Sequence, residues 1–293
     1  MNRKLLNDVE SNVIKEIEKS TDIEIDIEIN NQNKIIEISA LDCNIKKVPK
    51  VIKYLEDLQF LEISESKLPE LPQAIGKLLK LEKLIIYESN LKKLPDTINK
   101  LKNLRELMIA NSNLNHFPNQ ICSLKTLTHL SLSGNQIKVI LRCISELKNL
   151  IGLRMTDNLI KELPHSIGSL RNLRSIILSS NQISNIPNSI CQLEHLETLA
   201  LDNNNISKLP ECIGDLTNLI DLSLNNNELK KVPKSFINLK QLSGLDLSNN
   251  KFTEFPEMLK EMNLFELDIS GNPIDEFPKQ LKTIQMKEKG KYL

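Results

Sequence analysis

Two cysteine–histidine pairs are the places where this sequence could carry catalytic or metal chemistry. His195 follows Cys191 by four residues, and an imidazole beside a thiol is the arrangement that activates a cysteine nucleophile. Cys143 and His165 fall on neighbouring positions of successive repeats, and both residue types bind zinc. However, the four histidines share no metal-like spacing with the cysteines, and the repeat described below turns Cys191 toward the core. We therefore expect no catalytic residue, no bound metal and no cofactor.

Composition and charge exclude several other classes of function. The chain has eight glycines in 293 residues and no phosphate-binding glycine loop. Its 38 basic and 38 acidic side chains cancel, which argues against attraction of the whole chain to nucleic acid or to an anionic membrane. Aromatic residues make up 3% and tryptophan is absent, so base-stacking platforms are not indicated. We expect neither nucleic acid nor a membrane among the partners.

The N-terminus and the cysteines predict a compartment. No apolar run approaches the roughly 20 residues that span a bilayer, and the N-terminus, MNRKLLND, lacks the apolar stretch of a signal peptide. The five cysteines are odd in number and form no CxxC pair. We interpret them as small, partly buried thiols in a reducing compartment, without disulfide-bonded caps. We therefore expect a cytoplasmic protein, with non-classical export as the open alternative.

A pattern that returns every 23 residues covers most of the chain. Its frame is L-x-x-L-x-L-x-x-N-x-L-x-x-L-P-x-x-I-x-x-L, and the only change of step is 22 residues between the last two units. A fixed period in this range predicts stacked supersecondary units rather than a single globular core. The eleven units begin at Ile35, Leu58, Leu81, Leu104, Leu127, Leu150, Leu173, Leu196, Leu219, Leu242 and Leu264.

The first half of each unit predicts a short strand. Its fourth and sixth residues are apolar in alternation with polar ones, so we expect them to point inward. The ninth residue is Asn in seven units, and a buried Asn must have its donors and acceptor satisfied. We expect one Asn per turn to bond the backbone of neighbouring turns as a ladder. The first four units carry Cys43, Ser66, Ser89 and Ser112 instead, so we expect a weaker ladder there.

The second half of each unit predicts a short helical turn on the opposite side. Its apolar residues are spaced by three, and proline suits the first turn of a helix, as at Leu163-Pro164. Ile140-Leu141 replaces the proline in one unit, and we expect a looser turn at that place. Stacking these units predicts a parallel sheet on a concave side and helical segments on a convex side.

The frame resembles the leucine-rich repeat family in its 23-residue class. It is similar to Ras-suppressor-type and Ras-scaffold-type repeat proteins, and equally to bacterial repeat proteins that include translocated effectors. The resemblance implies an α/β fold, a curved, right-handed leucine-rich repeat solenoid with a parallel concave sheet and short convex helical or 3-10 turns. It also implies a non-catalytic protein–protein interaction module, with small GTPases, phosphatases or kinases as possible partners.

Both ends of such a solenoid must be closed, because an open sheet edge invites aggregation. Residues 1–34 predict an N-terminal cap of a helix and an antiparallel strand, in which isoleucines at 23–29 alternate with acids. Residues 35–286 hold the eleven repeats, and residues 287–293 form a polar tail that we expect to be frayed. The apolar face of the helix would consist of Leu5, Leu6, Val9, Val13, Ile14 and Ile17.

Charge is expected to be unevenly distributed over the repeats. The exposed concave positions are the third, fifth, seventh, eighth and tenth, and they hold 13 acids and four bases along the chain. That face therefore has a net charge of −9, although the whole chain is neutral. An acidic concave face would steer a partner with a basic surface. The alternative is that these acids only keep an exposed sheet soluble.

Apolar side chains gather on the same face in the N-terminal half. Aromatic residues and Met flanked by charge are typical of an interface anchor with a polar rim. Alternatively, some of them pack against the N-terminal cap. The predicted partner-binding residues are Phe60, Glu62, Glu65, Ile85, Tyr87, Glu88, Glu106, Met108, His129 and Arg154.

We predict a monomeric protein-binding module that is not an enzyme. Three alternatives stay open: a translocated bacterial effector that engages a host signalling protein, an enzyme with a convex-face site near Cys191, and a structural protein that self-associates through an exposed terminal strand.

Overall fold

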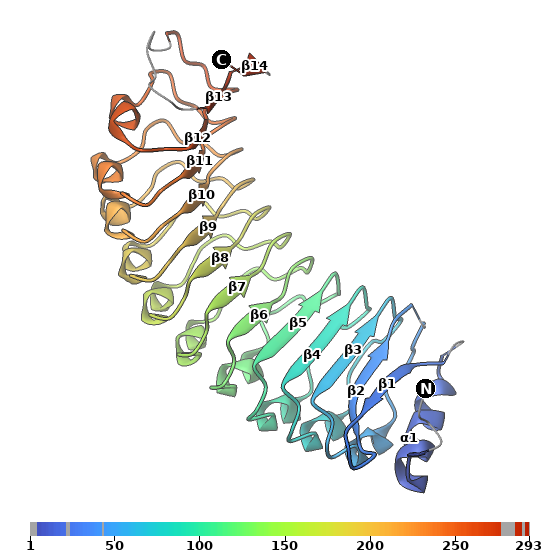
Figure 1. Cartoon of the computed structure of the whole chain (residues 1–293). Coiled ribbons are helices and arrows are strands. Elements are labelled where there is room, and N and C mark those ends of the chain that lie inside the picture. Colours follow the sequence, from blue (N-terminus) through green and yellow to red (C-terminus); the bar gives the residue numbers. More distant parts are fainter. Residues whose placement is uncertain (1–4, 22–23, 43, 277–284, 289–290, 293) are drawn as a thin grey trace. The chain divides into compact units, whose positions relative to one another are not determined.

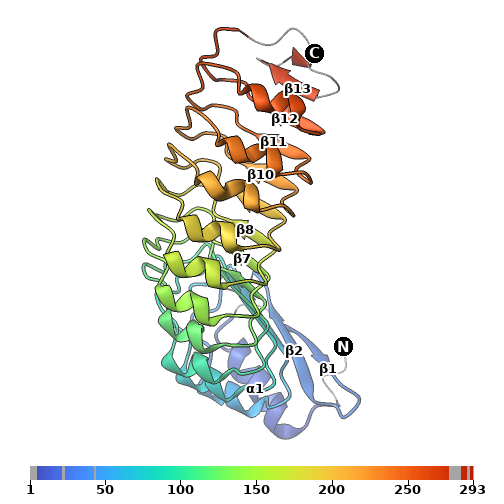
Figure 2. The same cartoon turned by 90° about the vertical axis from the view of Figure 1, so that its left-hand side faces the viewer.

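The computed structural model describes residues 5–21, 24–42, 44–276, 285–288 and 291–292. The chain forms two compact units, Met1–Ile137 and Lys138–Leu293. Within each unit, successive repeats contribute one strand and one short 3-10 helix, and the helices line the side opposite the exposed face of the strands (Figures 1 and 2). The predicted parallel sheet with outer helical turns is therefore confirmed.

The first unit begins with a helix and an antiparallel strand, followed by parallel strands that pair in chain order. Strand β1 runs antiparallel to β2, and β2 to β6 are parallel to their neighbours. The elements are α1 (Asp8–Glu18), β1 (Asp26–Ile29), β2 (Ile35–Ala40), η2 (Lys50–Tyr54), β3 (Phe60–Ser64), η3 (Gln73–Lys77), β4 (Lys83–Tyr87), η4 (Asp96–Lys100), β5 (Glu106–Ala110), η5 (Asn119–Ser123) and β6 (His129–Ser131).

The second unit repeats this arrangement with shorter strands. Strands β7 to β13 are parallel to their neighbours, and β14 closes the order in antiparallel pairing with β13. The elements are η6 (Arg142–Glu146), β7 (Gly152–Arg154), η7 (His165–Ser169), β8 (Ser175–Ile177), η8 (Asn188–Gln192), β9 (Thr198–Ala200), η9 (Glu211–Asp215), β10 (Asp221–Ser223), η10 (Lys234–Asn238), β11 (Gly244–Asp246), η11 (Glu257–Glu261), β12 (Glu266–Asp268), β13 (Gln285–Glu288) and β14 (Lys291–Tyr292).

The core of each unit follows from the alternation within the strands. In β4, Leu84 and Ile86 occupy the fourth and sixth repeat positions and are both 0% exposed, whereas their neighbours Lys83, Ile85 and Tyr87 are half-buried. Burial of each such Leu or Ile side chain contributes roughly 1.5–3 kcal/mol. Odd positions of the strand therefore remain available on the other face of the sheet.

Each outer 3-10 helix starts after a residue held in an extended conformation. Pro164 precedes η7 with φ −68° and ψ 143°, and its carbonyl accepts a hydrogen bond from Ile167 N at 3.0 Å. The expectation of a looser turn at Ile140-Leu141 is wrong. Leu141 adopts φ −70° and ψ 147°, and its carbonyl accepts from Ile144 N at 3.0 Å. Proline favours this conformation but is not needed for it, because leucine reaches the same φ and ψ region freely.

The predicted ladder at the ninth position is present and is richer where the residue is Asn. Asn204 Nδ2 donates to the carbonyls of Leu178 and Leu201 at 3.1 and 3.0 Å, and its Oδ1 accepts from Ile183 N at 2.9 Å. In the first unit, Ser89 and Ser112 share one 2.8 Å hydrogen bond between their hydroxyls. Ser66 Oγ is buried and has no partner among the described residues. The weaker ladder expected at the N-terminal end is thus confirmed.

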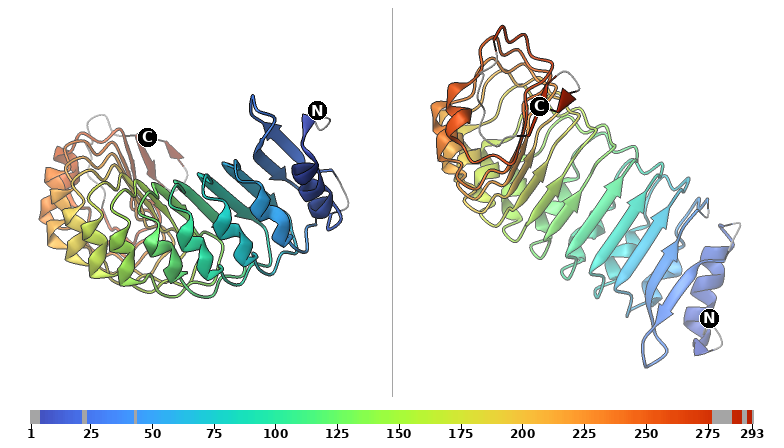
Figure 3. Two further views of the ribbon diagram at one scale, coloured as in Figure 1. Left: turned by 90° about the horizontal axis from the view of Figure 1, so that it is seen from below. Right: turned by 45° about the horizontal axis from the view of Figure 1, so that its top comes forward.

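The N-terminal cap differs from the prediction in the face that its helix buries. Val13, Ile14 and Ile17 are buried, but Val9 is 54% exposed and Leu5 is 50% exposed. Glu10 takes the remaining position on the buried face: Asn7 Nδ2 donates to its Oε2, and Ile35 N donates to its Oε1. The buried set 10, 13, 14 and 17 fits the spacing of one helical face as well as the predicted set with residue 9 does. Helix α1 packs against η2 at this end of the unit (Figure 3).

Both predicted ends contain strands. The expected antiparallel strand is present as β1, with Asp26 and Glu28 exposed and Ile27 half-buried; Ile23 and Cys43 lie outside the described residues. The prediction of a frayed tail at 287–293 is wrong for the described part of that segment. Strand β13 pairs in parallel with β12, and β14 folds back on β13. This hairpin covers the backbone groups that β12 would otherwise leave unpaired.

Candidate partner-binding surface

The residue at the eighth position of every repeat has a left-handed backbone conformation. The eighth position has φ of 48° at Asp42, 45° at Glu65 and 49° at Glu88, and the same conformation recurs at this position in both units. A non-glycine residue in this region costs roughly 1 kcal/mol. The repeat frame in the sequence does not mark this position, although Asn, Asp and Gly are frequent there, for example at Asn203 and Gly134. These three residue types tolerate the left-handed region best.

Three carboxylates are stacked at this position on successive turns of the first unit. Asp42, Glu65 and Glu88 are all exposed. The negative charge of Asp42 raises the pKa of Glu65, and Glu88 adds to the rise. Removal from water and the charge of Glu28 likewise raise the pKa of Glu37 on β2. Like charges at this spacing favour any cation that approaches them.

Apolar side chains lie beside these carboxylates on adjacent strands. Ile85 of β4 is directly opposite Glu62 of β3 on one side and Met108 of β5 on the other. Tyr87 lies two residues along β4, and the neighbouring Glu88 carboxylate raises the pKa of Tyr87. Ile85, Tyr87 and Met108 are half-buried. A binding partner would therefore cover side chains that are already held in place on a rigid sheet.

Lys83 links two of the predicted site residues in a way that the sequence did not indicate. Its Nζ lies 5.3 Å from the centroid of the Phe60 ring and 3.1 Å from Glu106 Oε2. These three residues stand side by side at the third repeat position of β3, β4 and β5. Ion pairs that face water contribute about 0–1 kcal/mol, so this arrangement is easily rearranged. In the unbound protein, however, Phe60 and Glu106 both have an internal partner.

We call the following set the anchor surface. It combines apolar residues of β3, β4 and β5 with the carboxylates around them. All eight members are among the predicted partner-binding residues. Its members are Phe60, Glu62, Glu65, Ile85, Tyr87, Glu88, Glu106 and Met108.

Two predicted residues lie outside this set. His129 is exposed on β6, opposite Glu106 of β5, and its Nδ1 is 3.1 Å from Thr128 Oγ1. It therefore borders the anchor surface. Arg154 is exposed on β7, which belongs to the second unit, and is not part of the surface described for the first unit.

The N-terminal cap leaves room beside the anchor surface. Strand β1 pairs with β2, and α1 packs against η2, which is on the opposite side of the repeat. Leu41, which follows β2, is still 45% exposed. The half-burial of Ile85 and Met108 follows from their position in the middle of the sheet, where each has a strand on both sides.

The cysteines depart from the sequence-based interpretation as reduced thiols. Cys191 and Cys212 form a disulfide between successive turns, with their Cα atoms 5.9 Å apart. The corresponding residues of another pair of turns, Gly168 and Ser189, are so close that a Cβ on Gly168 would lie 2.3 Å from the Ser189 carbonyl oxygen. The nineteenth position of one repeat therefore lies next to the seventeenth position of the following repeat, and two cysteines at these positions can form a disulfide. Sequence reasoning noted the shared positions but did not pair positions of successive turns.

The disulfide bears on the enzyme alternative near Cys191. The sulfur of Cys191 is bonded to that of Cys212, so it cannot act as a thiolate beside His195. Among the described residues, no group of three or more His, Cys, Asp or Glu side chains is arranged to hold a metal ion. No helix in the described part of the chain is long and apolar enough to cross a bilayer.

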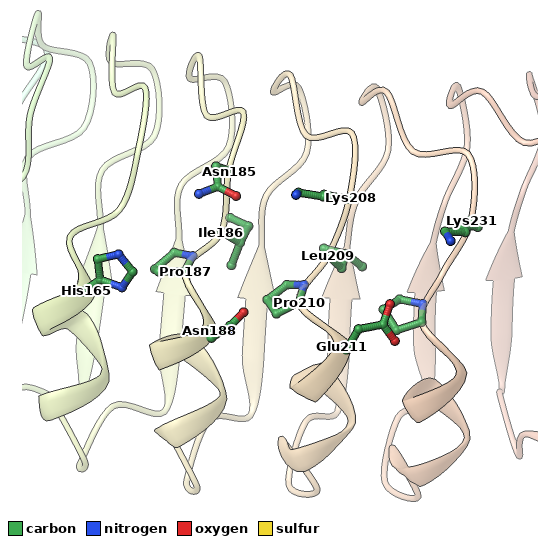
Figure 4. Close-up of a pocket in the computed structure, with 11 residues that line it drawn as sticks. His165, Asn185, Ile186, Pro187, Asn188, Lys208, Leu209, Pro210, Glu211 and Lys231 are labelled. Atoms are coloured by element: carbon green, nitrogen blue, oxygen red, sulfur yellow. The ribbon is translucent and has the colours of Figure 1, made fainter.

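Grooves lie on the side of the repeats opposite the exposed face of the strands. They are lined by the segments that lead into the 3-10 helices. The groove of the second unit lies between the segments that precede η7, η8, η9 and η10 (Figure 4). Its polar lining combines His165, Lys208, Lys231 and Glu211, and prolines such as Pro187 and Pro210 form part of its wall. The side chains of Lys208 and Glu211 point to different parts of the groove, so its charge is mixed.

Family models match most of the repeat region. One model, described as a leucine-rich repeat region, matches residues 34–138. A second model, described as a leucine rich repeat, matches residues 171–229, 194–252 and 217–274. Together these segments include more than half of the chain. No curated protein matches the chain.

Solved structures with a similar fold include bacterial and plant proteins. A leucine-rich repeat protein of Leptospira interrogans is 34% identical with a TM-score of 0.79, over 83% of this chain and 63% of that one. A plant peptide hormone receptor in complex with RGF2 is 28% identical with a TM-score of 0.70, over 83% and 45%. The ectodomain of an Arabidopsis thaliana membrane receptor kinase in complex with Casparian strip integrity factor 2 is 26% identical with a TM-score of 0.63, over 83% and 34%. The chain spans less than two thirds of each of these proteins.

Proposed function

This chain belongs to the leucine-rich repeat family, and we propose that it is a non-catalytic module that binds a protein partner through the anchor surface of its first unit. The observation that carries the proposal is the placement of Ile85 and Met108 on adjacent strands, with the stacked carboxylates of Glu65 and Glu88 beside them. An apolar centre with a charged rim is the usual anatomy of an interface.

The apolar centre is suited to act as the anchor. Ile85, Met108 and Phe60 are half-buried, so little conformational entropy is lost when a partner covers what remains exposed. Tyr87 adds a rigid aromatic side chain beside the carboxylate of Glu88. Tyrosine is among the residues that most often dominate binding energy at interfaces. A sheet that orders nothing on binding retains more of the contact energy as affinity.

The rim selects the chemistry of the partner. Asp42, Glu65 and Glu88 form one edge, and the raised pKa of Glu65 reflects the repulsion among them. A lysine or arginine side chain of the partner would relieve this repulsion, whereas an acidic segment would increase it. We therefore propose a partner segment that is basic and carries at least one apolar residue. Two of the similar proteins are plant receptors in complex with RGF2 and Casparian strip integrity factor 2, which supports binding of a protein ligand by this fold.

The test compares capture of partners from a cell lysate by matched variants. Ile85→Asp with Tyr87→Asp places two charges in the apolar centre. The control is Ile177→Asp with Ser179→Asp, which changes the same repeat positions of β8 and the residues after it, in the second unit. All four side chains are half-buried on the exposed side of the sheet, so circular dichroism should show folded protein for both variants.

The expected result is a protein that the wild type and the control retain and that the Ile85/Tyr87 variant loses. Loss from both variants, or retention by both, would contradict a role for the anchor surface. If nothing is captured by the wild type, a short peptide that alternates lysine and leucine serves as a direct probe. Failure of that peptide to bind the wild type more tightly than the Ile85/Tyr87 variant rejects the proposal.

A further inference from the structure

The side of the first unit opposite the anchor surface carries a basic groove. It lies between the segments that contain η2, η3 and the start of η4, and its volume is about 680 Å³. Its charged side chains are five lysines and a single carboxylate. We call this feature the lysine groove; its charged lining is Lys47, Lys50, Lys53, Lys77, Lys93 and Glu70.

Carboxylates of the described residues do not neutralise the lysines of this groove. All five are exposed, and none makes an ion pair with a carboxylate of the described residues. Elsewhere in the same unit lysines do find carboxylates: Lys80 pairs with Asp57, and Lys83 pairs with Glu106. Five lysines and one carboxylate therefore face a single groove, and a concave site with an excess of one sign of charge concentrates ligands of the opposite sign.

The floor of the lysine groove is apolar. Val48 and Leu71 are 2% and 4% exposed, and Pro72, Ala74 and Pro95 add to this apolar part of the lining. Gln73 and Thr97 are its uncharged polar members. The prolines have no amide N–H to offer, so the part of the floor that they form presents carbon atoms rather than donors. A ligand that fits must place small apolar groups on the floor and negative charges at the rim.

We propose that the lysine groove binds an acidic peptide segment of a second protein partner. An extended peptide directs successive side chains to opposite sides, so carboxylates and small apolar residues can alternate between rim and floor. A flat anionic membrane would contact the lysine ends but would leave the hollow floor unfilled. Nucleic acid is disfavoured because no arginine lines the groove and no aromatic side chain on its floor offers a stacking platform.

The second unit provides an internal comparison. Its groove lies at the same repeat positions as the lysine groove, yet it has mixed charge (Figure 4). Lys208 and Lys231 correspond in the repeat to Lys47 and Lys93, whereas Glu211 occupies the position of Lys50. The positive charge is therefore a property of the first three repeats and not of the fold.

The lysine groove and the anchor surface face opposite sides of one unit and have opposite charge. The strands carry the anchor surface, and the 3-10 helices border the groove. Figure 2 shows these helices on the side of the repeats opposite the exposed face of the strands. A basic partner and an acidic partner could therefore be held at the same time. The proposal for the groove does not depend on the anchor surface, because no residue is shared between them.

The test uses a fluorescent synthetic peptide that alternates glutamate and alanine, at physiological ionic strength. The groove variant is Lys47→Glu with Lys93→Glu, and the matched control is Lys208→Glu with Lys231→Glu. All four lysines are exposed at the same repeat position, so both variants should fold as the wild type does. We expect the Kd measured by anisotropy to rise at least about tenfold for the groove variant and less than about threefold for the control.

Several results would overturn the proposal. These are no binding by the wild type, equal weakening in both variants, or tighter groove-dependent binding of phosphatidylserine–phosphatidylcholine vesicles or of oligo-uridine than of the peptide. Concentration-dependent association of the protein itself, lost in the groove variant during sedimentation, would identify a second copy as the occupant instead. The Ile85→Asp, Tyr87→Asp variant should bind the acidic peptide like the wild type, so failure of one proposal can be distinguished from failure of the other.

Discussion

Asn181 Nδ2 donates a hydrogen bond of 2.9 Å to the carbonyl of Met155, which lies in the preceding turn of the second unit. The same side chain accepts from Ile160 N at 3.0 Å, so one buried amide joins its own turn to the one before. Buried backbone N–H and C=O groups must be paired. In these turns the Asn side chain pairs those that make no hydrogen bond within the short strands. The serines that replace Asn in the first unit cannot do this with a single hydroxyl.

Replacement of Ser66 by Asn should extend this ladder into the first unit. Ser66 Oγ is buried without a partner among the residues that the structure describes, and an amide there could donate to the carbonyl of Ala40 and accept from Ile45 N, by analogy with Asn181. We expect Ser66→Asn to raise the free energy of unfolding by about 1 kcal/mol, measured by urea denaturation. Ser89→Asn is the comparison, because it must give up the existing bond to Ser112 and should gain less. A loss of stability for Ser66→Asn would show that the larger side chain does not fit.

The disulfide between Cys191 and Cys212 predicts a response to reduction. The two residues are 21 positions apart, and closing a loop of this length stabilises a protein by about 3 kcal/mol in the chain-entropy description. Cys191→Ser with Cys212→Ser should therefore lower the free energy of unfolding of the second unit by an amount of that order. Peptide mapping without reductant should recover the two cysteines in one linked fragment. Complete alkylation of both in the folded, unreduced protein would contradict the assignment.

The pKa of Glu65 predicts how stability depends on pH. Because the charge of Asp42 raises this pKa in the folded state, the folded protein binds a proton more readily than the unfolded chain. Stability therefore falls as pH rises through the window between the ordinary value of 4.5 and the raised value, and this loss is complete once the pH exceeds the raised value. Glu65→Gln should be more stable than the wild type at neutral pH, and the difference should shrink as pH is lowered toward 4.5. A difference that is independent of pH would assign the effect to packing instead.

Much of the fold could be predicted from the sequence because the same residue types recur at the same positions of eleven repeats. Leucine at the fourth position and Asn at the ninth recur with one period, so a strand, a buried core and a ladder were predicted from their spacing alone. The outer turn was predicted from Leu163-Pro164 and similar pairs, but its dependence on proline was overestimated. The backbone of Leu141 shows that the surrounding turns impose the conformation, which a single repeat does not reveal.

The features that escaped prediction depend on pairs of side chains from different turns. Lys83 contacts Phe60 and Glu106, yet each of the three is an ordinary exposed residue in its own repeat. Cys191 and Cys212 bond because the two positions meet between turns, which requires the stacking distance and not only the period. Glu10 is buried in place of Val9 because its carboxylate accepts hydrogen bonds from the backbone of Ile35 and the side chain of Asn7. Hydrophobicity alone could not predict which of the two residues would be buried.

Lys83 should limit the affinity of the anchor surface for a basic ligand. In the free protein its Nζ lies over the Phe60 ring and beside Glu106 Oε2, so a ligand cation must displace it from both. We expect Lys83→Gln to bind a short lysine–leucine peptide several-fold more tightly than the wild type, since about 1 kcal/mol corresponds to a factor of five. The measurement is the Kd by fluorescence anisotropy at two salt concentrations.

A second lysine separates this effect from a simple change of net charge. Lys67 is exposed in the same unit, at the tenth repeat position, and makes no ion pair with a described residue. Lys67→Gln removes one positive charge as Lys83→Gln does, but it leaves the ring of Phe60 covered. If both variants strengthen binding equally, long-range charge is the cause and the contact of Lys83 with Phe60 is irrelevant. A larger gain for Lys83→Gln that persists at high salt, where long-range interactions are screened, identifies Phe60 as a residue that the ligand covers.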